Sequence, residues 1–100
     1  KTLSEDGMFS LVITIDTKNK FLPVEPQVVS RGFIYMKDSE ELTKEFIEFA
    51  KDYLNTEMQK HKAINLQALK FGLSEKLSEV IYQKTDRKPM ILPIFMDIHK

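Results

Sequence analysis

Apolar and polar residues alternate at the start of the chain. Residues 8–16 read MFSLVITID, and one face of this stretch carries Phe9, Leu11, Ile13 and Ile15. The two-residue period predicts a half-buried β-strand. A second run, rich in β-branched and aromatic residues, follows at 27–36 after the turn-forming sequence DTKNK. Because both faces of this second run carry apolar side chains, we expect it to be the central strand of a sheet.

A first helix is predicted to follow this strand. Asp38 is a good N-cap, and Glu41 three residues later completes a capping box. The apolar residues then recur at helical spacing, from Leu42 to Met58, while the opposite face mixes acidic and basic residues. We expect about five turns, ending near the polar sequence QKHK.

A second helix is predicted between Asn65, which can cap it, and the sequence QKTDRKP. Its apolar stripe consists of Leu66, Leu69, Leu73, Leu77, Val80 and Ile81. Gly72 lies inside this helix, where glycine costs about 1 kcal/mol relative to alanine. We therefore expect Gly72 to lie where the neighbouring helix or the sheet comes close.

The last strand is predicted at residues 90–98, MILPIFMDI, in which both faces are again largely apolar. Pro93 cannot donate a hydrogen bond to a neighbouring strand, which indicates an edge or a bulge. The predicted fold class is therefore α+β, in the order β-β-α-α-β. We expect a three-stranded sheet, mainly antiparallel or mixed, with both helices packed on one face.

Packing both helices on one face leaves the other face of the sheet open. We expect it to carry Ile91 and Phe95, together with Phe33 or Tyr35, and an apolar open face usually meets another domain or subunit. Arg31 shares a strand face with Phe33 and Tyr35. We predict that Arg31 is a structural or interface ion-pair partner, with Asp16, Asp97 or a residue outside this chain as its acceptor. Gly32, on the opposite strand face, would let another backbone come close.

Composition narrows the range of functions. One hundred residues make one domain, and 15 basic residues balance 15 acidic ones. This balance argues against a surface that binds nucleic acid over its whole area. The absence of cysteine excludes disulfides, cysteine nucleophiles and thiolate metal sites, and fits a cytoplasmic protein. No signal peptide and no apolar run long enough for a membrane span is present, and the chain starts at Lys1, so it can be a piece of a longer protein.

No residue set in the sequence predicts catalysis, cofactor binding or a metal site. Asp97 and His99 could share a strand face, but a zinc site needs a third and a fourth ligand. His61 lies in no metal-binding pattern, and Ser30 has no histidine nearby in sequence to activate it. The three glycines are too scattered for a phosphate-binding loop. The residues therefore favour a binding or assembly domain over an enzyme.

A small cationic cluster is the one sign of a nucleic-acid contact. Lys84, Arg87 and Lys88 lie at the connection between the second helix and the last strand, and with Arg31 they could contact a phosphate backbone. The competing interpretation is that they neutralise the negative C-terminal end of the second helix. The sequence favours this second interpretation.

Three stretches, in order and at this spacing, resemble the C-terminal domain of ribonuclease J. They are LSEDG before the first strand, VVSRGFIYMKDSEEL in the second strand and first helix, and YQKTDRKPMILPIFMDI at the end. The family-like segments lie at residues 26–35 and 84–93, and the resemblance covers nearly the whole chain. Departures from the family pattern are mild, such as Gln27 in place of an acidic residue.

The resemblance implies a non-catalytic assembly or dimerisation domain, with residues 1–100 lying downstream of metallo-β-lactamase and β-CASP domains. Ribonuclease J is a bacterial 5′-to-3′ exonuclease and endonuclease in RNA decay and in rRNA and mRNA maturation, and its two-zinc centre lies in those upstream domains. The resemblance thus implies no cofactor in this chain, which would not act as an enzyme alone. Its implied partners are its own upstream domains, another ribonuclease J subunit in a homo- or hetero-oligomer, and RNA as the substrate of the whole protein. An RNA-binding module is the alternative.

Overall fold

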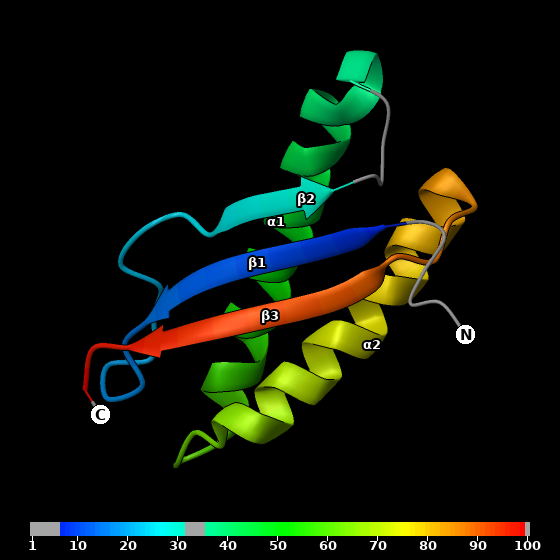
Figure 1. Ribbon diagram of the computed structural model, residues 1–100. Coiled ribbons are helices and arrows are strands. Elements are labelled where there is room, and N and C mark those ends of the chain that lie inside the picture. Colours follow the sequence, from blue (N-terminus) through cyan, green and yellow to red (C-terminus); the bar gives the residue numbers. More distant parts are fainter. Residues whose placement is uncertain (1–6, 32–35, 100) are drawn as a thin grey trace.

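The computed structural model describes residues 7–31 and 36–99 (Figure 1). Its elements are β1 (Met8–Ile15), β2 (Gln27–Arg31), α1 (Met36–Lys60), α2 (Leu66–Thr85) and β3 (Met90–Asp97). The fold is α+β in the order β-β-α-α-β, which confirms the predicted class and order. α1 begins two residues before the expected cap Asp38, whose side chain lies outside the described residues. β2 ends at Arg31 and is shorter than predicted, and residues 32–35 lie outside the described part.

The sheet is mixed, with the strand order β2-β1-β3. β1 pairs antiparallel with β2 and parallel with β3 over its whole length, from Met8 beside Met90 to Ile15 beside Asp97. The expectation that the second strand is central is therefore wrong, because the long crossover through both helices returns β3 to the free side of β1. Apolar residues on both faces did not require a central position, since Val29 of β2 remains 47% exposed.

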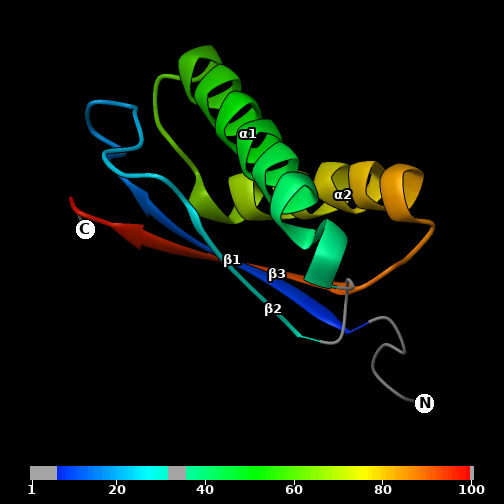
Figure 2. The same cartoon turned by 90° about the horizontal axis from the view of Figure 1, so that it is seen from above.

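Both helices cover the same face of the sheet, as predicted (Figure 2). The core between the layers consists of apolar side chains that are almost completely buried: Phe9, Leu11, Ile13, Ile15, Phe46, Ala50, Leu54, Met58, Leu69, Leu73, Leu77 and Ile81. The rings of Phe9 and Phe46 meet edge to face, with centroids 5.6 Å apart, and so join β1 to α1. None of the described helices is long and apolar enough to cross a membrane.

The last strand presents the opposite face from the one expected. Ile91 and Phe95 pack against the core, and Pro93 between them is fully buried. The expectation that Ile91 and Phe95 face outward is therefore wrong. The physical reason is the parallel register, which aligns Ile91, Pro93 and Phe95 with the core-facing residues of β1. The edge position predicted from Pro93 is confirmed.

Local capping fixes both ends of α2. The side chain of Asn65 accepts a hydrogen bond from the Ala68 N–H at 3.1 Å, which confirms the predicted N-cap. Asp86 ends the helix in the left-handed conformation, at φ 64°, and its N–H donates to the Tyr82 carbonyl at 2.7 Å. The connection to β3 starts from this turn.

Candidate functional site

The face of the sheet away from the helices carries mostly apolar side chains. We call it the outer sheet face, and its residues are Met8, Ser10, Val12, Thr14, Gln27, Val29, Met90, Leu92, Ile94, Met96 and Ile98. Four of its large apolar side chains are 39–55% exposed: Leu92, Ile94, Met96 and Ile98. None of these side chains is charged, and Figure 2 shows no described helix or strand on this side. Exposed apolar surfaces of this kind commonly mark interaction sites.

The polar residue at the middle of this face is already satisfied. Ser10 is 7% exposed, and its hydroxyl donates to the Leu92 carbonyl at 3.1 Å. A buried hydroxyl without a hydrogen-bond partner would cost about 1–3 kcal/mol. The Ser10 hydroxyl keeps its partner when the outer sheet face is covered, so this cost does not arise. The centre of the face is suited to a dry contact.

The structure describes only some of the interface residues that the sequence predicts. Phe33 and Tyr35 lie outside the described residues, as does Gly32. The Cα of Arg31 pairs with that of Met8, at the rim of the outer sheet face, and nothing further is described of its side chain. Whether these residues, or the inward-facing Ile91 and Phe95, contribute to an interface stays a prediction.

The proposed acceptors for Arg31 lie at the other end of the sheet. Asp16 follows Ile15 directly, and Asp97 pairs with Ile15, whereas Arg31 is beside Met8. Seven residues of extended chain separate these positions, roughly 23 Å. The expectation that Asp16 or Asp97 accepts from Arg31 is therefore wrong, and an acceptor outside this chain stays a prediction.

Asp16 and Asp97 instead fasten the end of β3 to the turn after β1. The Nε2 of His99 lies 3.0 Å from Asp16 Oδ1, and the His99 N–H donates to Asp97 Oδ1 at 2.9 Å. The hydroxyl of Thr17 donates to Asp97 Oδ2 at 2.8 Å. The N–H and the side-chain amide of Asn19 donate to the carboxylate of Asp16, which is 3% exposed. Sequence reasoning missed this cluster, since His99 is far from Asp16 in the chain.

These contacts favour the charged carboxylates. Burial opposes ionisation of Asp16, but the hydrogen bonds from Asn19 and the nearby His99 outweigh it, so the pKa of Asp16 lies below its usual value. The backbone N–H of His99 is the main cause that lowers the pKa of Asp97, and Thr17 adds to it against the cost of burial. Among the described residues, no group of three or more acidic or histidine side chains is arranged to hold a metal ion.

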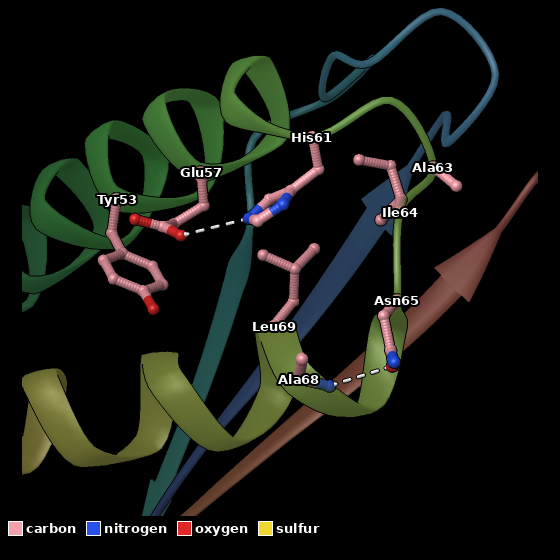
Figure 3. Close-up of a pocket in the computed structure, with 8 residues that line it drawn as sticks. All are labelled: Tyr53, Glu57, His61, Ala63, Ile64, Asn65, Ala68 and Leu69. Carbon is pink, nitrogen blue, oxygen red and sulfur yellow. Dashed lines mark hydrogen bonds and ion pairs between the residues drawn. The ribbon is translucent and has the colours of Figure 1, made fainter.

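A small pocket of about 100 Å³ lies between the end of α1 and the start of α2 (Figure 3). Its lining residues are Tyr53, Glu57, His61, Ala63, Ile64, Asn65, Ala68 and Leu69. Glu57 lies 3.0 Å from the Lys60 Nζ and 3.9 Å from the His61 Nε2. Burial, aided by the charge of Glu57, raises the pKa of Tyr53, so its phenol stays neutral. The carboxylate of Glu57 is therefore already paired with Lys60 of the same helix.

The predicted cationic cluster is partly engaged within the domain. The Nζ of Lys84 lies 3.0 Å from Glu45 of α1, and the Nζ of Lys88 lies over the Tyr82 ring, 5.0 Å from its centroid. The N–H of Arg87 donates to the Thr85 hydroxyl at 3.1 Å. The sheet register brings the backbone of Arg31 to the same end of the molecule, two strands away from Met90. Whether these residues contact RNA stays a prediction.

Comparison with known proteins identifies the family. The family model described as "Ribonuclease J C-terminal domain" matches residues 1–98. The chain belongs to the ribonuclease J C-terminal domain family. It is 36% identical over 96 residues to "Ribonuclease J 2" of Staphylococcus epidermidis and 34% identical to "Ribonuclease J 2" of Staphylococcus aureus. These alignments cover 96% of this chain and 17% of each relative, so the chain spans about a sixth of their length.

The ribonuclease J C-terminal domain is one part of a longer protein in both relatives. The outer sheet face is therefore the strongest candidate site in this chain, because it combines exposed apolar side chains with an internally satisfied centre.

Proposed function

We propose that this chain is the assembly domain of a ribonuclease J, and that its outer sheet face packs against the same face of a second subunit. One observation carries the proposal: the outer sheet face is apolar, uncharged in its described side chains, and not covered by either helix. A surface of this composition has no group that would bind phosphate, so it suits another apolar surface.

Symmetry supports a second copy as the occupant. In a two-fold dimer the same patch meets itself, so any charge on the patch would face its own like charge near the axis. The side chains of Val29, Leu92, Ile94 and Met96 place no charge there. Two such sheets would pack face to face about 10 Å apart, as the layers of a β-sandwich do. Arg31, at the rim by its strand register, would then be a candidate ion-pair partner for a residue of the second subunit.

The size of the face predicts a weak contact. The three strands, of eight, five and eight residues, cover roughly 330 Å², whereas a stable interface buries about 800 Å² on each partner. The chain alone should therefore dimerise only at high concentration. In the longer protein, contacts between the upstream domains would raise the effective concentration of the two faces.

The wider function of the longer protein is also part of this proposal. Its nuclease chemistry, with metallo-β-lactamase and β-CASP domains, two zinc ions and RNA as the substrate, would lie upstream of this chain in a cytoplasmic enzyme. The relatives carry the name ribonuclease, which supports this placement. This chain would supply no catalytic group and would support activity by holding subunits together. A purely RNA-binding role through Lys84, Arg87 and Lys88 has less support, since Lys84 pairs with Glu45 and Lys88 stacks on Tyr82.

A charge placed on the outer sheet face tests the proposal. Ile94 is 47% exposed on the edge strand, so Ile94→Asp should fold and should abolish concentration-dependent dimerisation in analytical ultracentrifugation. Phe71 of α2 is 67% exposed on a different surface, and Phe71→Asp is the matched control, which should associate like the unmodified chain. Association that survives Ile94→Asp, or that is lost only with Phe71→Asp, would show that this face is not the interface.

A further inference from the structure

Two basic segments that lie far apart in the sequence meet at one corner of the molecule. Lys18 and Lys20 belong to the turn after β1, Lys60 is the last residue of α1, and His61 and Lys62 follow it directly. We call these five residues the basic corner. In Figures 1 and 2 the turn after β1 lies beside the end of α1 and the connection to α2. This corner is at the opposite end of β1 from Arg31 and Met90.

Hydrogen bonds hold the two segments together. The Nζ of Lys20 donates to the His61 carbonyl, and the side-chain amide of Gln59 donates to the Lys20 carbonyl at 3.2 Å. The turn itself is built on Asp16, whose carbonyl accepts from the Lys20 N–H at 2.7 Å. Lys20 adopts the left-handed conformation, at φ 62°, to close this turn. These hydrogen bonds hold the two segments of the basic corner side by side before any ligand binds.

The exposed charge of the corner is positive. Lys18, Lys60 and Lys62 are exposed, and within the described part of the chain Lys18 and Lys62 make no ion pair. The nearby carboxylates are less accessible and already occupied. Glu57 is bound by Lys60, and Asp97 accepts from Thr17 and His99. The corner thus presents several ammonium groups to a polyanion with little opposing exposed charge.

An aromatic side chain and a groove continue from the corner. Phe21 follows Lys20 directly and is 46% exposed. It lines an open groove of about 340 Å³ between the loop after β1 and α1, together with Leu22, Pro23, Val24, Glu25, Lys51 and Asn55. Gln59 and Asn55 lie one helical turn apart on α1, so the groove runs along the helix away from the lysines. Lys51 and Glu25, which form an ion pair at 3.0 Å, also line it.

We propose that the basic corner and this groove bind single-stranded RNA. The ammonium groups of Lys18 and Lys62, and the N–H donors of Lys20 that do not bind the His61 carbonyl, contact phosphates. An unstacked base lies on the Phe21 ring, with the Asn55 amide within the same groove. A positive track next to an exposed aromatic ring is the arrangement that single-strand binders use. An acidic peptide could also satisfy the lysines, but only one with an aromatic or apolar side chain at the right spacing would use the ring. Every base of RNA has a face that can stack on it, so RNA is the better fit.

This inference rests on the placement of the chain in an RNA-degrading protein, made under the proposed function, but not on the outer sheet face. The site would hold about four nucleotides. Three phosphate contacts predict that the logarithm of the binding constant falls with the logarithm of salt concentration with a slope of about −2. The role of such a site would be to retain a single strand close to the subunit.

The test is fluorescence anisotropy with a labelled six-nucleotide oligouridylate at several salt concentrations. We expect salt-dependent binding that weakens about ten-fold in Lys18→Ala/Lys62→Ala, with the salt slope reduced by about 1.4. Phe21→Ala should weaken binding about ten-fold through lost stacking while the salt slope stays unchanged. The matched control is Lys44→Ala/Lys76→Ala, which removes two exposed lysines from the helices and should bind like the unmodified chain.

Three results would overturn the inference. They are no binding at low salt, equal weakening by the control pair, and an oligoglutamate peptide that binds as tightly as the RNA. The Ile94→Asp variant separates this inference from the assembly proposal, because it should lose dimerisation and keep RNA binding. A chain that dimerises but binds no RNA refutes only the basic corner, and a chain that binds RNA but never dimerises refutes only the outer sheet face.

Discussion

The hydroxyl of Tyr53 lies directly over Gly72, where α1 and α2 approach each other. A β-carbon built on Gly72 would fall 2.1 Å from the Tyr53 hydroxyl oxygen and 3.3 Å from the ring carbon that carries it. The Tyr53 ring is held in turn by Phe49, stacked at a centroid distance of 6.5 Å. The absence of a side chain at Gly72 therefore sets how closely the two helices pack, as its place in the helix predicted.

Gly72→Ala should destabilise the fold despite the better helix propensity of alanine. The substitution would gain about 1 kcal/mol in an open helix, but forcing a methyl group against Tyr53 should cost more, for a net loss of about 1–2 kcal/mol. Urea unfolding followed by circular dichroism measures this.

A second substitution shows whether Tyr53 is the cause. Tyr53→Phe removes the atom that lies closest to the added methyl group, so the double variant should recover at least half of the loss. Gln67→Ala, at an exposed position on the same helix, serves as the control and should change stability little. A Gly72→Ala chain more stable than the unmodified one would refute the account of this contact.

The elements of the fold could be predicted because their signals are local. The cap at Asn65, the close approach at Gly72 and the edge position of Pro93 each follow from one residue type in one sequence context. Strand order could not be derived in the same way, because the parallel pairing of β3 with β1 joins residues about 80 positions apart. Both faces of MILPIFMDI are also largely apolar, so the sequence did not show which face turns toward the core. The orientation of Ile91 and Phe95 was therefore predicted wrongly.

The candidate sites were harder to predict than the fold. The outer sheet face was expected, but its members depended on the register of β3, which the residues alone do not determine. The basic corner was missed because Lys20 and His61 are 41 residues apart, and neither DTKNK nor QKHK is unusual by itself. The pairing of Asp16 with His99 was missed for the same reason. Contacts between distant loops depend on the packed layers that bring those loops together.

Acid should weaken the fold through the turn after β1. The pKa of Asp16 is lowered in the folded state, so this carboxylate stabilises the fold at pH values above its unfolded pKa, near 3.8. That contribution is lost as the pH falls through the lower folded pKa. The same sign holds for Asp97. Urea unfolding between pH 6 and pH 2.5 should therefore show a decline in the free energy of unfolding at the acidic end.

Asp16→Asn should make that decline shallower, because the variant has one less carboxylate to protonate. Asp52→Asn, at an exposed position on α1, is the comparison and should leave the pH dependence close to that of the unmodified chain. Equal pH profiles for Asp16→Asn and the unmodified chain would mean that the contacts with Asn19 and His99 do not stabilise the charged form.

Isotope-filtered NMR can detect directly whether the outer sheet face packs against the same face of a second copy. A concentrated sample mixes labelled with unlabelled chains, so that only contacts between subunits give cross-peaks. We predict cross-peaks among the methyl groups of Val29, Leu92, Ile94 and Met96. Cross-peaks from Phe71 and other exposed helix residues in place of these would show that the interface lies elsewhere. A sample that dimerises but gives no cross-peak from the outer sheet face would show the same.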